Sequence, residues 1–273
     1  MTGIPGGASP RSGSAAAEGR DTGRALWLPH QHGAWAMLAV PLLLGVAAGG
    51  PAPWQLVLAA AAVAGYLASA TTQAWLRARR RPSYLFSLRM YGATFAVLAV
   101  ALVATHPPIA LAGLVVVPAA VVGLLGARPG ARREVGDSLA QVVEAIVLTP
   151  VAAYLSGAFE PPIVTVYSAI AAAYLVGTVL VVRSVIRERG NTAFAASSVG
   201  YHAALVVVAA LWLPAPYAFV AAGLTARALA LPIVQRRRAG TPHPLRPVQV
   251  GAVEAVAALA VVLVAFVAPA VAA

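Results

Sequence analysis

Nine apolar stretches, each of roughly twenty residues, recur along the sequence and constrain its fold more than any other feature. A helix rises ~1.5 Å per residue, so about 20 apolar residues cross the ~30 Å hydrocarbon layer of a bilayer. We therefore expect an all-α, polytopic transmembrane helical bundle of about nine helices. The stretches are Gly33–Gly49, Trp54–Leu76, Leu85–Thr105, Ile109–Gly126, Ser138–Ser156, Ile163–Val182, Phe194–Leu213, Tyr217–Val234 and Val248–Ala268.

The composition agrees with a membrane protein. Of the 273 residues, 60% are hydrophobic and 10% are charged, whereas soluble domains are about 25% charged. A soluble globular protein is therefore excluded. The sequence contains no cysteine, which excludes disulfides, thiolate metal sites, iron–sulfur clusters and a cysteine nucleophile.

The 19 basic residues are all arginines and outnumber the 8 acidic residues. Arginines accumulate in the cytoplasmic loops of membrane proteins. Here they fill every second loop, at 77–81, 128–133, 183–189 and 236–246, and the loops between these lack arginine. We predict a multi-pass protein of the bacterial inner membrane with a cytoplasmic N-terminus, an external C-terminus and anionic lipid head groups as partners. Nucleic acid binding is not expected, because topology already explains the basic loops.

Residues 1–25 precede the first apolar stretch and are rich in Gly, Ala, Ser and Pro with scattered charges. We expect a disordered cytoplasmic tail, followed by a single transmembrane domain at 26–273. An alternative treats the first stretch as a cleaved signal peptide, because the apolar run Leu38–Val46 is followed by the small residues Ala47–Gly50. Cleavage would leave the topology of the other eight stretches unchanged.

Polar and ionisable side chains within the apolar stretches are few, and their sequence positions place all of them in the cytoplasmic half. Such groups are costly in hydrocarbon unless paired or hydrated, so they are functional candidates. The outer half is nearly pure Ala, Val, Leu, Gly and Ile. This asymmetry favours a cytoplasm-facing pocket whose polar groups bind the head of an amphipathic ligand and whose apolar walls hold the tail.

The candidates fall into two groups by their chemistry. Those that could act as acid or base catalysts are His32, His202, Glu144 and Glu254. Those that could bind a ligand head group are His30, Gln31, Gln73, Arg187 and Arg227.

Arg227 and Glu254 lie on consecutive antiparallel helices at similar depth from their shared loop, so we expect them to pair. In one interpretation the pair is structural and fixes helix register. In the other, Arg227 anchors a phosphate or carboxylate, which its planar guanidinium suits. Glu144 is the alternative partner of Arg227, and would leave Glu254 free.

A metal or haem site would need His30 or His32 together with His202. Residues at i and i+2 do not share a helix face, and no supporting carboxylate is evident. We therefore predict no metal site, and the sequence indicates no particular cofactor.

The segment Leu28–Met37, LPHQHGAWAM, resembles the opening motif of the YwiC-like family of bacterial integral membrane proteins. That family opens with a comparable Pro-(Lys/His)-Gln-His-Gly-Ala-Trp-Ala-Met stretch. Beyond the motif, the likeness covers nearly all of the chain after the tail, as apolar helices with basic inner loops. The resemblance implies a membrane protein whose biochemical role is unassigned.

A weaker likeness is to UbiA-type membrane prenyltransferases, which have nine helices, a cytoplasm-facing cavity and Asp-rich loops that hold Mg²⁺ and a diphosphate. This sequence departs from that pattern. Its loop after Gln73 offers Arg77 and Arg81 where carboxylates would be needed, and the later loop offers one acid, Glu188. The resemblance therefore implies at most a shared architecture, without magnesium-dependent chemistry.

Taken together, these features predict a YwiC-like membrane protein that binds or modifies an isoprenoid-like or other lipid-like ligand. Whether it is an enzyme is left open. One alternative is a permease or exporter for a small solute, which the apolar outer half disfavours. Another is a membrane assembly factor without chemistry, in which the polar groups only set helix register.

Overall fold

The computed structural model describes residues 34–128, 135–239, 241 and 245–270, and all regular structure in these ranges is helical. The tail and the candidates His30, Gln31 and His32 lie outside them. The helices are α2 (Ala34–Gly49), α3 (Trp54–Arg77), α4 (Leu85–Thr105), α5 (Gly113–Leu125), α6 (Val135–Ile146), α7 (Leu148–Leu155), α8 (Pro161–Ile186), α9 (Thr192–Trp212), α10 (Ala215–Arg238) and α11 (Pro247–Val267), with two 3₁₀ turns, η1 (Pro82–Tyr84) and η2 (Pro107–Ala112).

Seven segments within the described ranges are long and apolar enough to cross a membrane. Five are the helices α3, α8, α9, α10 and α11, and two join a 3₁₀ turn to the helix after it, η1 to α4 and η2 to α5. Two shorter apolar segments occupy the remaining expected positions, Trp35–Gly49 and Ser138–Tyr154. The polytopic helical bundle is thus confirmed, and the number of spans and their orientation stay predictions.

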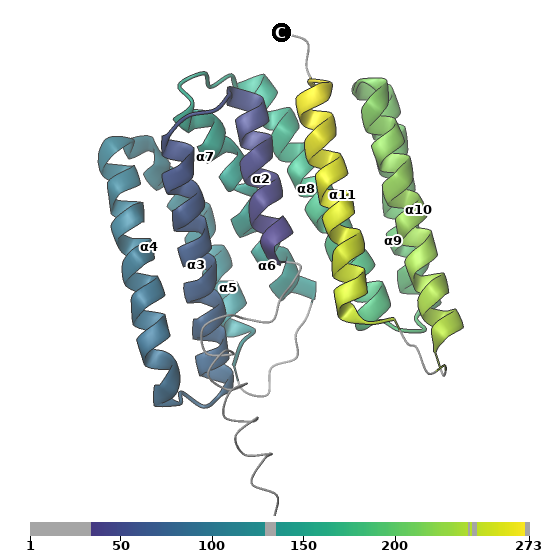
Figure 1. Cartoon of the computed structure of the whole chain (residues 1–273), viewed down its shortest axis with the longest axis horizontal. Coiled ribbons are helices and arrows are strands. Elements are labelled where there is room, and N and C mark those ends of the chain that lie inside the picture. Colours follow the sequence, from purple (N-terminus) through teal and green to yellow (C-terminus); the bar gives the residue numbers. More distant parts are fainter. Residues whose placement is uncertain (1–33, 129–134, 240, 242–244, 271–273) are drawn as a thin grey trace, which may run out of the picture.

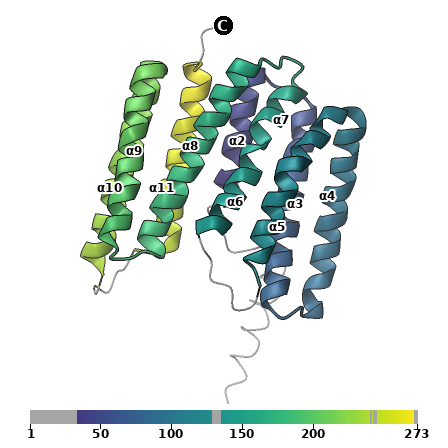
Figure 2. The same cartoon turned by 180° about the vertical axis from the view of Figure 1, so that it is seen from behind.

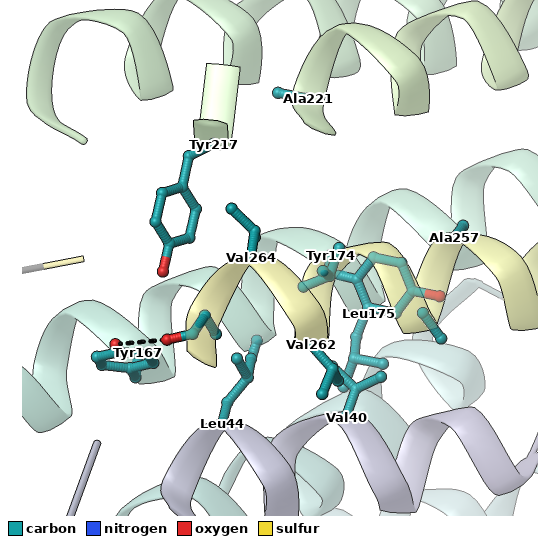
Figure 3. Close-up of a cluster of buried hydrophobic side chains, with 14 of the residues drawn as sticks. Val40, Leu44, Tyr167, Tyr174, Leu175, Tyr217, Ala221, Ala257, Val262 and Val264 are labelled. Carbon is teal, nitrogen blue, oxygen red and sulfur yellow. Dashed lines mark hydrogen bonds between the residues drawn. The ribbon is translucent and has the colours of Figure 1, made fainter. Parts of the chain in front are cut away.

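The helices run nearly parallel to one another in two layers (Figures 1 and 2). One layer contains α4, α3, α2, α11 and α10, and the other contains α5, α6 with α7, α8 and α9. The hydrophobic core lies mainly where α2, α8 and α11 meet. There the hydroxyl of Tyr167 donates to the carbonyl of Ala265 at 3.2 Å (Figure 3).

The expected helix at Ser138–Ser156 is broken into α6 and α7 at Val147. Pro150 explains the break, because its ring clashes with the carbonyl four residues earlier and it has no N–H to donate. That carbonyl belongs to Ile146, the last residue of α6. The hydroxyl of Thr149, next to the break, donates to the carbonyl of Pro41 in α2 at 3.0 Å.

Two glycines one turn apart, Gly45 and Gly49, pack α2 directly against α7. A Cβ atom at Gly45 would lie 2.6 Å from the Cβ of Ala152, and one at Gly49 would lie 2.7 Å from the carbonyl oxygen of Ala153. No side chain fits at either position without moving a backbone. This is the small-residue spacing by which transmembrane helices pack closely.

Gln55 shows how the chain satisfies a buried polar side chain in a structural role. Its Oε1 accepts from the N–H of Ala52 at 2.8 Å, and its Nε2 donates to the carbonyls of Gly50 at 2.8 Å and Ala152 at 2.9 Å. These three bonds tie the start of α3 to α7 and occupy both ends of the amide.

Candidate functional site

Arg227 of α10 and Glu254 of α11 form an ion pair inside the bundle. Arg227 Nη1 lies 2.6 Å from Glu254 Oε2, and the two side chains are 6% and 3% exposed. Such a short, charge-assisted bond offsets part of the cost of removing both charges from water. Of the two partners weighed for Arg227, the structure therefore has Glu254 and not Glu144.

His202 of α9 extends this pair. Its ring is 1% exposed, and its Nδ1 lies 2.7 Å from the carbonyl oxygen of Ser198, one turn earlier. A carbonyl can only accept, so Nδ1 carries the hydrogen and Nε2 has the free lone pair. Arg227 Nη2 lies 3.3 Å from that Nε2 and donates to it. The guanidinium thus joins a carboxylate on one side to a neutral imidazole on the other.

Helix α8 closes the site with small and polar side chains. The hydroxyl of Tyr174 donates to the backbone carbonyl of Glu254 at 3.2 Å. Gly177 leaves room for the imidazole, since a Cβ atom there would lie 2.7 Å from His202 Nε2. The buried hydroxyl of Thr178, one turn after Tyr174, has no hydrogen-bond partner among the described residues. We refer to His202, Arg227 and Glu254 as the α9–α11 polar cluster.

Two members of the polar cluster lie near the middle of their helices. His202 is near the middle of α9, which has 21 residues, and Arg227 is near the middle of α10, which has 24. The sequence placed both residues in the cytoplasmic half. Helix α10 continues past Val234 to Arg238 and α9 begins at Thr192 instead of Phe194, and the depth of these residues in a membrane stays a prediction.

Several buried polar atoms in the cluster and on residues beside it lack a hydrogen-bond partner among the described residues. They are Arg227 Nε, Glu254 Oε1, Thr178 Oγ1 and Ser198 Oγ. Buried polar atoms in native proteins are normally satisfied. The cluster is therefore only partly satisfied, in contrast to Gln55.

A second feature is a groove between the C-terminal ends of α3 and α5, with a volume of about 830 Å³. Three arginines and four aliphatic side chains line it: Arg79, Arg80, Arg128, Leu76, Val121, Leu124 and Leu125. We call it the α3–α5 groove. The backbones of Arg79 and Arg80 have φ of 51° and 62°, a left-handed conformation that is uncommon for non-glycine residues. The guanidinium of Arg80 lies 5.5 Å from the ring centroid of Trp75.

The other candidates lie apart from both sites. Gln73 is buried one turn before the groove, where its Oε1 accepts from Arg77 Nη2 at 3.0 Å. Glu144 is half-buried on α6, and a Cβ atom placed on Gly123 of α5 would lie 4.0 Å from its Oε1. Arg187 is exposed and follows the last residue of α8. These three residues therefore do not join the polar cluster.

Within the described ranges, no group of three or more His, Asp or Glu side chains could hold a metal ion. The sequence had suggested neither Tyr174 nor Gly177 for the cluster, and neither Arg79 nor Arg128 for a pocket. The sequence of an apolar helix does not show which residues of other helices a given aromatic residue or glycine contacts. The two arginines are separated by two transmembrane segments, so only the folded chain brings them together.

Comparison with known proteins identifies the family. The chain is 31% identical over 206 residues to the "Uncharacterized protein YwiC" of Bacillus subtilis (strain 168), an alignment that covers 71% of this chain and 81% of the relative. The chain belongs to the YwiC-like family. The model of that family, described as "YwiC-like protein", matches residues 28–154. No solved structure matches the chain.

Only one of the two sites lies within the residues that the YwiC-like family model matches. The matched part contains both sides of the α3–α5 groove, since Arg79 and Arg128 fall within 28–154. The polar cluster lies on α9, α10 and α11, after the matched residues.

Proposed function

We propose that this YwiC-like protein binds an anionic amphipathic ligand, of the lipid or isoprenoid class, in the α3–α5 groove. The observation that carries the proposal is the lining of the groove, where three guanidinium groups and four aliphatic side chains share one cavity. Guanidinium groups suit phosphate and carboxylate oxygens. An aliphatic wall beside them suits a hydrocarbon tail.

The size and location of the groove also support this proposal. Its volume of about 830 Å³ lies within the ~300–1,000 Å³ typical of ligand pockets. It opens at the end of the bundle that carries the arginine-rich loops, which the positive-inside rule assigns to the cytoplasm. A ligand there would keep its charged head at the membrane surface and its tail in hydrocarbon.

The residues that line the groove favour ligand binding over catalysis. The described residues of the groove include no histidine, aspartate or glutamate that could act as acid or base. His202 and Glu254, two of the catalytic candidates, belong to the polar cluster on α9 and α11. We therefore assign the groove a binding role, and the cluster a separate one.

Native mass spectrometry of the protein released from its own membranes in mild detergent tests the proposal. We expect wild type to retain a ligand of defined mass, and an Arg79→Ala/Arg128→Ala variant to lose it. The matched control is Arg237→Ala/Arg238→Ala, which removes two exposed arginines from the inner end of α10 and should retain the ligand. Equal retention by both variants would contradict the proposal.

A small-solute permease is the second candidate function, because His202 and Arg227 lie halfway along their helices. Transporters place their substrate sites near the middle of the bilayer. Solute flux in proteoliposomes that is lost on Arg227→Ala, but not on Arg79→Ala/Arg128→Ala, would favour the permease over ligand binding.

A further inference from the structure

The polar cluster differs in one respect from two structural polar contacts of the same protein, those of Gln55 and Thr149. Gln55 uses both ends of its amide, and Thr149 donates to the carbonyl of Pro41. In the cluster, Arg227 Nε and Glu254 Oε1 are buried with no hydrogen-bond partner among the described residues. An arrangement that only fixed helix register would gain from satisfying these atoms. The cluster thus retains hydrogen-bonding capacity that its present state does not use.

The state of His202 shows where a proton could be added. Nδ1 already carries a hydrogen that it donates to Ser198, so Nε2 is the only basic position on the ring. Arg227 Nη2 donates a hydrogen bond to this nitrogen across 3.3 Å. A proton on Nε2 would turn the acceptor into a donor and place two cations against each other.

Glu254 has a carboxylate oxygen that could accept a hydrogen bond from a protonated Nε2. One carboxylate oxygen, Oε2, accepts from Arg227, and the other, Oε1, has no hydrogen-bond partner in the part of the chain that the structure describes. Among the described residues, the remaining polar groups that face the cluster are uncharged: the hydroxyls of Tyr174 and Thr178 on α8 and of Ser198 on α9, and the side chain of Tyr201 on α9, whose ring centroid lies 5.6 Å from that of His202. Glu254 is therefore the only anion in the cluster that could stabilise an imidazolium.

We propose that the α9–α11 polar cluster is an intramembrane proton-binding site, with His202 Nε2 as the acceptor. The proton comes from water, and its arrival breaks the hydrogen bond from Arg227 to His202. The new Nε2–H then donates to Glu254 Oε1, and Glu254 bridges Arg227 and His202. The net charge of the cluster changes from zero to +1, and α9 becomes joined to α11 through the carboxylate. This role is independent of the α3–α5 groove.

Nitrogen-15 NMR of the imidazole tests the site directly. The full chain would be labelled at histidine, reconstituted in nanodiscs and scanned from pH 8 to pH 5. The other four histidines, His30, His32, His106 and His243, are replaced by Gln, so that His202 gives the only signal. We expect one protonated and one unprotonated nitrogen at pH 8, and loss of the unprotonated Nε2 signal as the pH falls.

Two variants separate a proton-binding role from a structural one. Glu254→Gln removes the anion that would stabilise the imidazolium, so His202 should keep its unprotonated Nε2 signal over the whole range. Tyr217→Phe alters another buried hydroxyl, on α10, and should titrate as the parent does. A His202 signal that stays neutral until the protein unfolds, or that titrates unchanged in Glu254→Gln, would overturn the proposal. If Glu254→Gln does not fold, the parent scan alone still decides.

Discussion

At the residue scale, the deciding fact is that one cation and one anion are buried within hydrogen-bonding distance in the middle of a helical bundle. A lone charge in such surroundings is costly, whereas a pair can be replaced by apolar residues with little loss. Arg227 and Glu254 should therefore behave as a unit. The imidazole of His202 adds a contact at 3.3 Å that depends on the same guanidinium.

A double-mutant cycle measures this unit. Arg227→Met and Glu254→Leu should each lower the free energy of unfolding by about 3–5 kcal/mol, because each leaves an unpaired buried charge. The double variant should lose less than either single variant. Denaturant titration in detergent micelles gives the three values. Losses that simply add would contradict the pairing.

Sequence reasoning predicted this pair and failed on its surroundings, for identifiable reasons. Consecutive antiparallel helices and similar depth suffice to bring Arg227 and Glu254 together. The helix that carries Arg227 is longer than expected because Arg236–Arg238 continue α10 instead of forming a loop. Arginine is a good helix former and extends its charged end toward water, so an arginine run does not end a helix.

At the element scale, close backbone contact between short helices organises the first half of the bundle. Helix α2 packs against α7 through Gly45 and Gly49, and α7 begins where Pro150 interrupts the preceding helix. The sequence placed a single helix at Ser138–Ser156. A proline in an apolar run does not by itself show whether the helix bends or stops, and here the break lies beside the contact from Thr149 to Pro41.

Two glycine-to-alanine substitutions, both within helices but with different neighbours, test this packing. Gly45→Ala places a Cβ atom 2.6 Å from Ala152 Cβ, whereas Gly92→Ala on α4 meets no atom within 4 Å. Overpacking of this kind costs about 1–3 kcal/mol. Thermal unfolding in detergent should show a lower Tm for Gly45→Ala and no loss for Gly92→Ala. Equal Tm values for the two variants would show that α2 and α7 do not pack closely.

At the scale of the whole molecule, the helices form two layers (Figure 1), and arginine-rich connections alternate along the sequence with arginine-free ones. The helix positions expected from hydropathy agree with the structure because apolar length is a property of local sequence. The α3–α5 groove could not be predicted in this way. Arg79 and Arg128 become neighbours only when α3 and α5 pack with their inner ends together.

The absence of cysteine allows a clean test of orientation. Glu160 precedes α8 at one end of the bundle, and Asn191 precedes α9 at the other. In intact cells, a membrane-impermeant maleimide should label Glu160→Cys and leave Asn191→Cys unlabelled until the membrane is opened. The reverse pattern would place the N-terminus outside and move the groove to the external face.

The central claim, that the α3–α5 groove binds an anionic amphipathic ligand, is tested most directly by quenching of Trp75, which lies beneath Arg80. The other four tryptophans, Trp27, Trp35, Trp54 and Trp212, are replaced by Phe. The protein is then titrated with brominated phosphatidylglycerol or brominated phosphatidylcholine. We predict stronger quenching by the anionic lipid, and loss of that preference in the Arg79→Ala/Arg128→Ala variant. Equal quenching by the two lipids, or a preference that survives both substitutions, would contradict the claim.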